Sequence, residues 1–293
     1  MAHKSGFVSI VGNPNVGKST LMNRLVGERI SIITSKSQTT RHRIKGIVNH
    51  EDYQIVFSDT PGVVKPSYKM QEYMLEFSKS ALGDADLIVY VTDVVEDIKK
   101  NEDFIEKVKK SGVPVLLVIN KIDLSNQEKV EGLYTEWADI IPQAEIFPLS
   151  ATEDFNVGNL FKRIVELLPE GEPFFGKDEF TDMPARFFVS ELIREKILLH
   201  YEREIPYSVE IEIEEFKEEK TKISIRAIIY VERDSQKGIL IGHKGEALKR
   251  VGTEARMDIE RFFEKHVFLT TVVKIKKDWR SKEDDLKKFG YTQ

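Results

Sequence analysis

One glycine-rich segment, GNPNVGKS from Gly12 to Ser19, constrains the fold of this chain more than any other feature. It matches the pattern G-x-x-x-x-G-K-[ST] and directly follows the apolar run Phe7–Val11, which is expected to form a strand. The next residues, Ser19–Val26, have the spacing of an amphipathic helix. Between a strand and a helix, the backbone amides of such a loop curl around phosphate groups at the helix N-terminus. The segment therefore predicts a phosphate-binding loop at the start of an α/β domain.

Apolar runs alternate with helical patterns through the first part of the chain, an order typical of doubly wound α/β domains. The runs are rich in Val, Ile and Leu, as expected for strands that are buried on both faces. The predicted strands are Phe7–Val11, Tyr53–Asp59, Asp86–Asp93, Val113–Asn120 and Ala144–Ser150. The predicted helices are Ser19–Val26, Tyr68–Ala81, Glu102–Lys110 and Val157–Leu168. We therefore expect a mostly parallel sheet that binds its ligand beyond the carboxyl ends of the strands.

Three further polar motifs stand where predicted strands end. Asp59–Gly62 reads DTPG, in which the carboxylate can hold Mg²⁺ through water and the glycine amide can reach a γ-phosphate. Asn120–Asp123 reads NKID, and its aspartate can accept two hydrogen bonds from guanine, where adenine offers no donor. Ser150–Thr152 could support the base through a backbone amide. Taken singly, each of these motifs could also be an ordinary turn or a helix cap.

In this order, each at a strand end, the motifs resemble those of P-loop GTPases, and the resemblance covers about half of the chain. It implies a domain that binds and hydrolyses GTP and uses Mg²⁺. The metal is expected to be held by Ser19, Thr40 and Asp59. The nucleotide, as GTP or GDP, is expected to contact Gly12, Asn13, Pro14, Asn15, Val16, Gly17, Lys18, Ser19, Thr20, Asp59, Thr60, Pro61, Gly62, Asn120, Lys121, Asp123, Ser150, Ala151 and Thr152.

The polar segment from Ile33 to Arg43 has the composition of a switch loop, which is mobile without GTP. In GTPases a threonine of this loop caps Mg²⁺ when the γ-phosphate is present. By the family pattern that residue is Thr40, with Thr39 as the alternative. An ordinary surface loop without a role in nucleotide binding would have the same composition.

Two residues depart from the family pattern. Val63 stands where Ras-like GTPases have a glutamine that orients the attacking water, so backbone groups, a partner or an ion must place that water here. Thr152 stands where the last motif of the family more often has Lys or Leu.

Asn15 stands where related GTPases use an asparagine to help bind K⁺, and the resemblance therefore makes K⁺ a further candidate cofactor. The expected catalytic groups are Thr40, Gly62 and Asn15.

A second region begins after a stretch that breaks regular structure. The segment from Pro169 to Pro184, PEGEPFFGKDEFTDMP, contains three prolines and two glycines. The predicted division is a GTPase domain at 1–170, a linker at 171–185, and a second domain with a C-terminal tail at 186–293. Residues 1–185 hold 21 basic and 28 acidic side chains, whereas residues 186–293 hold 23 and 21. This asymmetry is compatible with two modules that bind different partners, and equally with ordinary solvated helix faces.

The second region is predicted to run helix, strand, strand, helix, glycine loop, helix, strand. The segments are Phe187–Tyr201, Tyr207–Phe216, Lys222–Val231, Ser235–Leu240, Gly242–Gly245, Glu246–Lys265 and Val267–Ile275. The order resembles a KH domain of the prokaryotic type, type II, an α+β fold whose G-x-x-G loop clamps single-stranded RNA. Such a loop can also simply join two helices. The residues expected to bind RNA are Gly242, His243, Lys244, Gly245, Lys249 and Arg250, with Arg256, Lys274, Lys276 and Lys277 extending the basic surface.

The succession of these two domains, with LKKFGY (Leu286–Tyr291) near the C-terminus, resembles the Era family of bacterial GTPases over nearly the full length. The resemblance implies binding to small-subunit ribosomal RNA near its 3′ end, assistance in assembling the 30S-type subunit, and a peripheral contact with the inner face of the cell membrane. We expect a cytoplasmic protein, because the chain shows no signal segment, no apolar run long enough to span a bilayer, and no cysteine. Two alternatives stay open: an RNA-binding scaffold with a structural nucleotide, and a GTPase of the tRNA-modification type.

Overall fold

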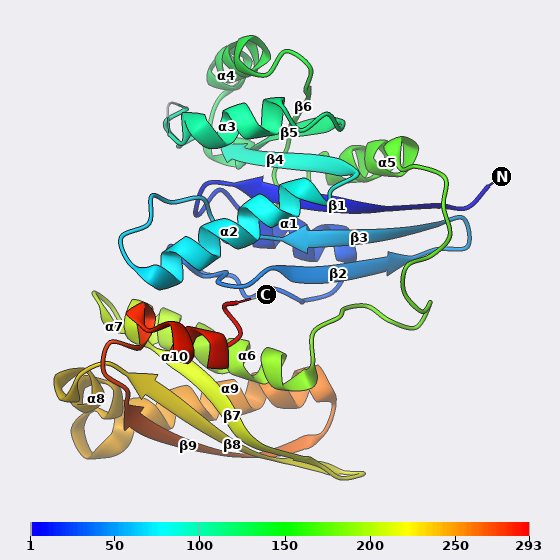
Figure 1. Ribbon diagram of the computed structural model, residues 1–293. Helices are drawn as coiled ribbons and strands as arrows, with labels where there is room; N and C mark the ends of the chain where they lie inside the picture. Colours follow the sequence, from blue (N-terminus) through cyan, green and yellow to red (C-terminus); the bar gives the residue numbers. More distant parts are fainter. Residues whose placement is uncertain (1, 99, 293) are drawn as a thin grey trace. The chain divides into compact units, whose positions relative to one another are not determined.

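A six-stranded sheet forms the centre of the first part of the chain (Figure 1). The computed structural model describes residues 2–98 and 100–292. The strands lie in the order β2-β3-β1-β4-β5-β6, and every neighbouring pair is parallel except β2 and β3. Their bounds are β1 (Lys4–Gly12), β2 (Ile44–Asn49), β3 (Tyr53–Asp59), β4 (Leu87–Asp93), β5 (Val115–Asn120) and β6 (Glu145–Pro148). The predicted mostly parallel sheet is confirmed.

Two apolar cores lie on opposite faces of this sheet. Successive side chains of a strand point to opposite faces, so β4 contributes Val89 and Val91 to one core and Ile88 and Tyr90 to the other. The first core is closed by α1 (Lys18–Val26) and α5 (Val157–Leu167), and the second by α2 (Lys69–Gly83), α3 (Glu102–Lys109) and α4 (Gln127–Ile140). Helices on both faces confirm the doubly wound arrangement, and the carboxyl ends of β1, β3, β4 and β5 meet at one edge of the sheet.

Two elements of this sheet domain were not predicted from the sequence. Strand β2 reads IKGIVN, where Lys45 and Gly46 interrupt the apolar pattern, and it lies at the edge of the sheet, where it needs only one neighbour. Helix α4 has fourteen residues, all of them described, and Trp137 alone is buried. Its other apolar side chains that pack against the second core, Val130, Leu133 and Ile140, are only partly buried.

Residues 171–182, expected to be part of a linker, form an irregular segment without helix or strand that we call the strap. The amide of Phe174 donates a hydrogen bond to Oε1 of Gln54 at 2.7 Å. The amide of Ile47 on β2 donates to the carbonyl oxygen of Phe180 at 2.9 Å. By its contacts the chain divides into two compact units, the residues up to Ser67 with Gln71–Asp182, and Tyr68–Met70 with the residues from Met183 onward. The strap therefore groups with the first unit, where it covers the outer edge of β2.

A three-stranded sheet with two long helices forms the second unit (Figure 1). Strand β8 is central, with β7 antiparallel and β9 parallel to it. Helices α6 and α9 share one apolar core with this sheet. The elements are α6 (Ala185–His200), α7 (Ile205–Ser208), β7 (Glu210–Glu218), β8 (Lys222–Val231), α8 (Asp234–Ile241), α9 (Glu246–Phe263), β9 (His266–Ile275) and α10 (Glu283–Lys288). Apart from the short helices α7 and α10, this is the predicted order of a type II KH domain, and that fold is confirmed.

The segment that follows β9 packs onto the second unit. Trp279 is fully buried, and its indole Nε1 donates to the carbonyl oxygen of Ser208 at 3.0 Å. The hydroxyl of Tyr291 donates to Oε2 of Glu210 at 2.7 Å, and its side chain is also buried. Two buried aromatic side chains whose polar atoms are hydrogen-bonded anchor this segment firmly.

Candidate nucleotide site and RNA-binding loop

The loop after β1 requires glycine at two points of close approach. At Gly17, φ is +95° and a Cβ atom would lie 2.2 Å from Nδ2 of Asn120. At Gly12, a Cβ atom would lie 2.1 Å from the carbonyl oxygen of Val91 on β4. The loop can therefore lie tightly against β4 and β5 only because these side chains are missing. Above it opens a cavity of about 400 Å³.

The predicted nucleotide contacts gather around this cavity. Its wall contains Pro14, Asn15, Gly17, Lys18, Ser19, Thr20, Thr40, Gly62 and Lys121, with Thr34 and Leu124 beside them. The other predicted contacts that the fold buries are Gly12, Asn13, Val16, Asp59, Thr60, Pro61, Asn120, Ser150 and Ala151. Asp123 and Thr152 are exposed. The fold thus brings residues from four separate motifs to one edge of the sheet.

Lys18 is a buried cation at the base of the cavity, with 6% of its surface exposed. Its Nζ donates a hydrogen bond to the carbonyl oxygen of Asn13 at 2.7 Å. Burial lowers the pKa of Lys18 to about 8, although the nearby carboxylates of Asp59 and Glu96 act in the opposite direction. A buried ammonium whose pKa stays lowered despite these carboxylates is a strong site for an anionic group such as a phosphate.

Three oxygen atoms form a compact group beside Lys18. Oγ of Ser19 donates to Oδ2 of Asp59 at 2.7 Å and lies 2.9 Å from Oγ1 of Thr40. Oγ1 of Thr40 lies 3.3 Å from the same carboxylate oxygen. Burial raises the pKa of Asp59, and its Oδ1 accepts no hydrogen bond within the described residues.

This oxygen group fits Mg²⁺, a hard cation that takes oxygen ligands at about 2.0–2.1 Å. In an octahedron of that size, neighbouring ligands stand about 2.9 Å apart, close to the spacing of Ser19 and Thr40. A cation there would also compensate the buried carboxylate of Asp59. The described residues hold no cluster of three or more His, Cys, Asp or Glu side chains that could bind a metal.

The two neighbouring threonines of the predicted switch loop face different partners. The hydroxyl of Thr40 lies against Ser19 and Asp59. The hydroxyl of Thr39 lies 2.7 Å from that of Thr34 and donates to the carbonyl oxygen of Lys36 at 2.6 Å. Thr40 therefore belongs to the oxygen group, whereas Thr39 closes a turn inside the loop.

The backbone at Gly62 and Val63 passes close to the phosphate loop. A Cβ atom at Gly62 would lie 2.6 Å from Cα of Pro14, so this approach also depends on glycine. The amide of Val63 donates to the carbonyl oxygen of Gly12 at 3.2 Å. The side chain of Val63 is 4% exposed and packs into the second core, so it does not reach the cavity.

Asn120 connects the phosphate loop to the loop after β6. Its Nδ2 donates to the carbonyl oxygen of Val16 at 2.8 Å, and its Oδ1 accepts from the amide of Ala151 at 3.0 Å. Lys121 donates to the carbonyl oxygen of Asn15 and to Oδ2 of Asp93, each at 2.5 Å. The exposed Asp123 makes no hydrogen bond or ion pair within the described residues.

Several residues outside the predicted motifs support this site. Arg24 on α1 donates from Nε to the carbonyl oxygen of Ala151 at 3.2 Å and from Nη2 to that of Thr152 at 3.0 Å. Asp93 holds Lys121, and Asn101 contacts both the phosphate loop and Val63. No short motif marks these three residues. The sequence offered only the position of Asp93 at a strand end as a signal.

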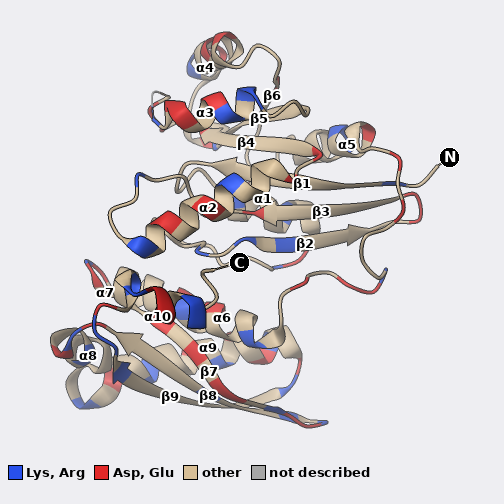
Figure 2. Ribbon diagram, in the orientation of Figure 1, with Lys and Arg blue, Asp and Glu red and all other residues tan. Residues whose placement is uncertain are grey.

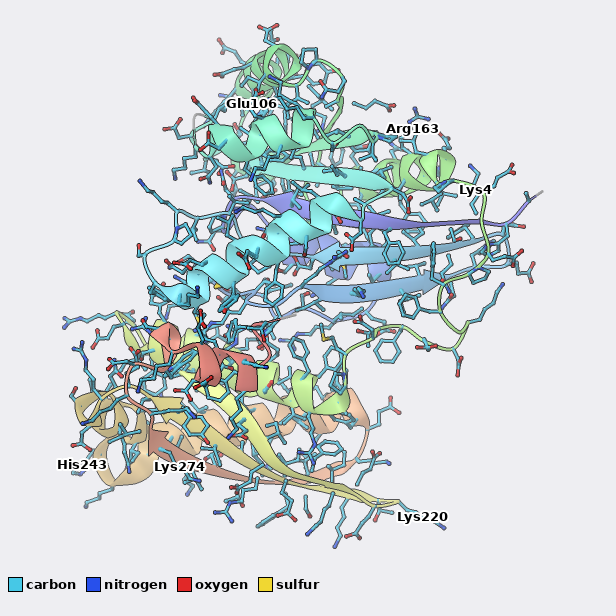
Figure 3. The ribbon with its side chains drawn as sticks, in the orientation of Figure 1. Lys4, Glu106, Arg163, Lys220, His243 and Lys274 are labelled. Atoms are coloured by element: carbon cyan, nitrogen blue, oxygen red, sulfur yellow. The ribbon has the colours of Figure 1, made fainter. Side chains whose placement is uncertain are left out.

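The predicted RNA-binding loop connects α8 and α9. Gly242 has φ +73° and ψ −179°, and a Cβ atom there would lie 2.6 Å from Cβ of Ala247. Gly245 has φ +80° and ψ 8°, and a Cβ atom there would meet nothing within 4 Å. His243 and Lys244 between them are exposed, and Figure 3 shows His243 at the outer end of the loop. The two glycines thus turn the backbone so that both polar side chains reach solvent.

The surface around this loop is basic in part. Lys249 and Arg250 on the first turns of α9 are exposed. Figure 2 shows further basic residues at the end of β9 and acidic residues along β7. Of the residues expected to extend the basic surface, Arg256 pairs with Glu260 at 2.7 Å, Lys276 with Asp285 at 2.8 Å and Lys274 with Glu214 at 3.9 Å. These pairs reduce the positive charge, so the basic surface is smaller than a count of Lys and Arg implies.

Comparisons with known proteins match both parts of the chain. A family model described as 50S ribosome-binding GTPase matches residues 7–121, and a KH domain model matches residues 204–280. A crystal structure of Era in complex with MgGDPNP and nucleotides 1506-1542 of 16S ribosomal RNA is 38% identical, with a TM-score of 0.95. A variant of Aquifex aeolicus Era bound to GDP and AlF4⁻ is 39% identical, with a TM-score of 0.94. Each alignment covers 99% of this chain and 100% of the other.

Proposed function

The chain belongs to the Era family of GTPases, and we propose that it is a GTP-dependent switch that binds small-subunit ribosomal RNA near its 3′ end and assists maturation of the small subunit. The observation that carries the proposal is the full-length match to an Era structure that holds both a GTP analogue and a segment of 16S ribosomal RNA. We assign the nucleotide to the predicted domain at 1–170 and the RNA to that at 186–293.

The enzyme hydrolyses GTP by transferring the γ-phosphoryl group to water, which yields GDP and phosphate. In the proposed roles, the ammonium of Lys18 and the amides of the phosphate loop bind the β- and γ-phosphates. Ser19 and Thr40, with Asp59, hold Mg²⁺, and their close spacing supports this assignment. When bound, Mg²⁺ offsets the negative charge of the phosphate oxygens.

Placement of the attacking water falls to groups other than the side chain at position 63, since Val63 is apolar and buried. The Gly62 amide is proposed to bind the γ-phosphate and so to order the switch when GTP is present. A K⁺ ion near Asn15 remains a prediction, and it would supply charge where the glutamine of other GTPases is absent. Guanine recognition is assigned to Asp123, whose carboxylate is exposed and unbonded within the described residues.

RNA binding is assigned to the loop between α8 and α9. Gly242 and Gly245 let the RNA backbone approach, and His243 and Lys244 offer exposed polar contacts. Lys249 and Arg250 extend this surface along α9, where they can neutralise phosphates. The role of this loop as an RNA clamp is supported by its position in a KH fold rather than by the G-x-x-G pattern alone.

A cytoplasmic location is proposed from family membership. Among the described residues, no helix has the length and apolarity needed to cross a bilayer. Peripheral contact with the inner face of the membrane stays a prediction from the family resemblance.

The test combines GTP turnover with RNA binding by the purified protein. We expect GTP hydrolysis that depends on Mg²⁺. The binding of a fluorescent RNA with the 3′-end sequence of the small-subunit ribosomal RNA should be tighter with GDPNP than with GDP. Gly242→Asp should abolish RNA binding and leave turnover without RNA unchanged, because it places a carboxylate where phosphates approach.

Gly132→Asp is the matched control, since it adds the same charge to α4, where a Cβ atom meets nothing within 4 Å. It should leave RNA binding unchanged. Bound nucleotide without turnover would overturn the switch in favour of a scaffold with a structural nucleotide. RNA binding that is indifferent to sequence, or unaffected by Gly242→Asp, would exclude the proposed ribosomal RNA clamp.

A further inference from the structure

Asn101 is a residue outside every motif, yet it joins two parts of the nucleotide site. Its Nδ2 donates one hydrogen bond to Oδ1 of Asn13 in the phosphate loop and a second, at 3.0 Å, to the carbonyl oxygen of Val63. The amide group has two hydrogens, so both are used. Asn101 stands directly before α3 with φ +59° and ψ 41°, a left-handed conformation that asparagine adopts more readily than most residues. The backbone conformation and the side chain of Asn101 therefore both suit this bridge, the pair of hydrogen bonds that links Asn13 to Val63.

Val63 is held at both of its backbone polar groups. Its amide donates to Gly12, and its carbonyl oxygen accepts from Asn101. Its side chain is buried in the second core. The preceding residue, Gly62, lies so close to Pro14 that it has no room for a Cβ atom. The bonds to Val63 therefore also restrict the position of the Gly62 amide.

The other end of the bridge is anchored in β4. Asn13 is 4% exposed, and its side chain hydrogen-bonds with the carboxylate of Glu96. Glu96 in turn accepts a hydrogen bond from Oγ1 of Thr92 at 3.0 Å. The contacts run from the sheet through Glu96 and Asn13 to Asn101, and from there to Val63.

We propose that Asn101 is a positioning residue for GTP hydrolysis, which holds the backbone of Val63, and with it the Gly62 amide, where the γ-phosphate is recognised. The inference rests on the proposed function, because it takes the γ-phosphate as the ligand of Gly62. The physical reason is that position 63 is a valine, where Ras-like GTPases have a glutamine that orients the attacking water. Because the side chain at position 63 cannot orient the reacting groups, the rate of GTP hydrolysis depends more strongly on the position of the backbone. A displacement of about 1 Å can lower such a rate about 100-fold.

Two substitutions remove the bridge in different ways. Asn101→Gly deletes the side chain but keeps the left-handed backbone accessible. Asn101→Asp keeps the shape and replaces the NH2 group, with both donated hydrogens, by one oxygen atom that faces Oδ1 of Asn13 and the carbonyl oxygen of Val63. In both variants we expect kcat to fall about tenfold, because this factor corresponds to the free energy of one to two lost hydrogen bonds. The affinity for GDPNP relative to GDP should fall at least fivefold, and the affinity for GDP should stay within twofold.

Asn156→Gly is the matched control. Asn156 also stands before a helix in the left-handed conformation, with φ +64°, and its Nδ2 donates to the carbonyl oxygen of Pro148 at 2.8 Å. Its loss should lower the melting temperature without changing the ratio of GDPNP to GDP affinity. That ratio separates positioning from a merely structural role.

The two possible failures are distinguishable. A wild-type protein that does not turn over GTP, or binds GDPNP and GDP without Mg²⁺ dependence, would contradict the proposed function. A wild-type protein that behaves as a GTPase, with kcat and the affinity ratio of both Asn101 variants within twofold of its own, would overturn the inference about Asn101 alone. Thermal melting of both variants shows whether each is folded.

Discussion

The two glycines of the loop between α8 and α9 should tolerate substitution to very different extents. Gly242 combines φ +73° with ψ −179°, a region of backbone conformation that is essentially restricted to glycine and costs other residues about 1–3 kcal/mol. The Cβ atom of Gly242→Ala would also lie 2.6 Å from Cβ of Ala247, so the loop or the start of α9 must shift. Overpacking of this kind adds about 1–3 kcal/mol. We therefore expect a total cost of about 2–6 kcal/mol for Gly242→Ala.

Gly245 provides the comparison within the same loop. It lies in the left-handed helical region, at φ +80° and ψ 8°, and its Cβ position is open. Asparagine visits that region, where other residues pay about 1–2 kcal/mol, so Gly245→Asn should cost about 1 kcal/mol or less. The expected costs differ by at least about 1 kcal/mol, which is about a factor of five in affinity.

The assay is the affinity for the fluorescent 3′-end RNA, measured by anisotropy at one fixed salt concentration, because phosphate contacts make it strongly dependent on salt. Gly242→Ala should weaken RNA binding at least about fivefold more than Gly245→Asn. GTP turnover without RNA should be unchanged in both. The reasoning is refuted if Gly245→Asn weakens binding as much as Gly242→Ala, or if Gly242→Ala binds within threefold of the wild type.

Three further predictions concern the nucleotide site. Thr40→Ala should weaken Mg²⁺-dependent GDPNP binding about tenfold, and Thr39→Ala less than threefold; equal losses, seen with a fluorescent analogue, would contradict the assignment. GTP turnover should be faster in K⁺ than in Na⁺, and Asn15→Ala should remove the difference; equal wild-type rates in the two salts would exclude a K⁺ site. Because burial lowers the pKa of Lys18 to about 8, the ligand-free ammonium loses its proton as the pH rises from 7 to 9, so nucleotide affinity should fall over that range. Binding near pH 8.5 should take up a proton, which calorimetry in two buffers of different ionisation enthalpy detects; no uptake would refute this.

Contiguous motifs made much of the nucleotide site predictable. The phosphate loop holds Lys18 and Ser19 within one stretch of chain, and the expectation that Thr40 rather than Thr39 meets the metal rested on a short pattern too. Arg24 and Asn101 could not be found in this way. Asn101 lies 88 residues from Asn13, and Arg24 lies 127 residues from Ala151, so only the folded sheet brings each pair together.

The edge of the sheet was difficult to predict for a different reason. A strand with one neighbour needs no complete apolar face, and β2 carries Lys45 and Gly46 within six residues. The strap has no periodic apolar pattern, since it is held by hydrogen bonds with Gln54, which accepts from the amide of Phe174, and with backbone groups of β2, rather than by a buried apolar face. Its proline and two glycines correctly indicated the lack of helix and strand. They gave no sign of where the segment would bind.

The strap has a practical consequence for where the chain can be cut. An uncovered edge strand presents free amides and carbonyls to any other extended chain and is a common start of aggregation. Here Phe180 accepts from Ile47, and the hydroxyl of Thr181 donates to the carbonyl oxygen of Lys45 at 2.7 Å, so the outer edge of β2 is already paired. A fragment that ends at residue 170 would lose this cover. A soluble, isolated nucleotide-binding unit should therefore extend through Asp182, even though the helix that closes its core ends at Leu167.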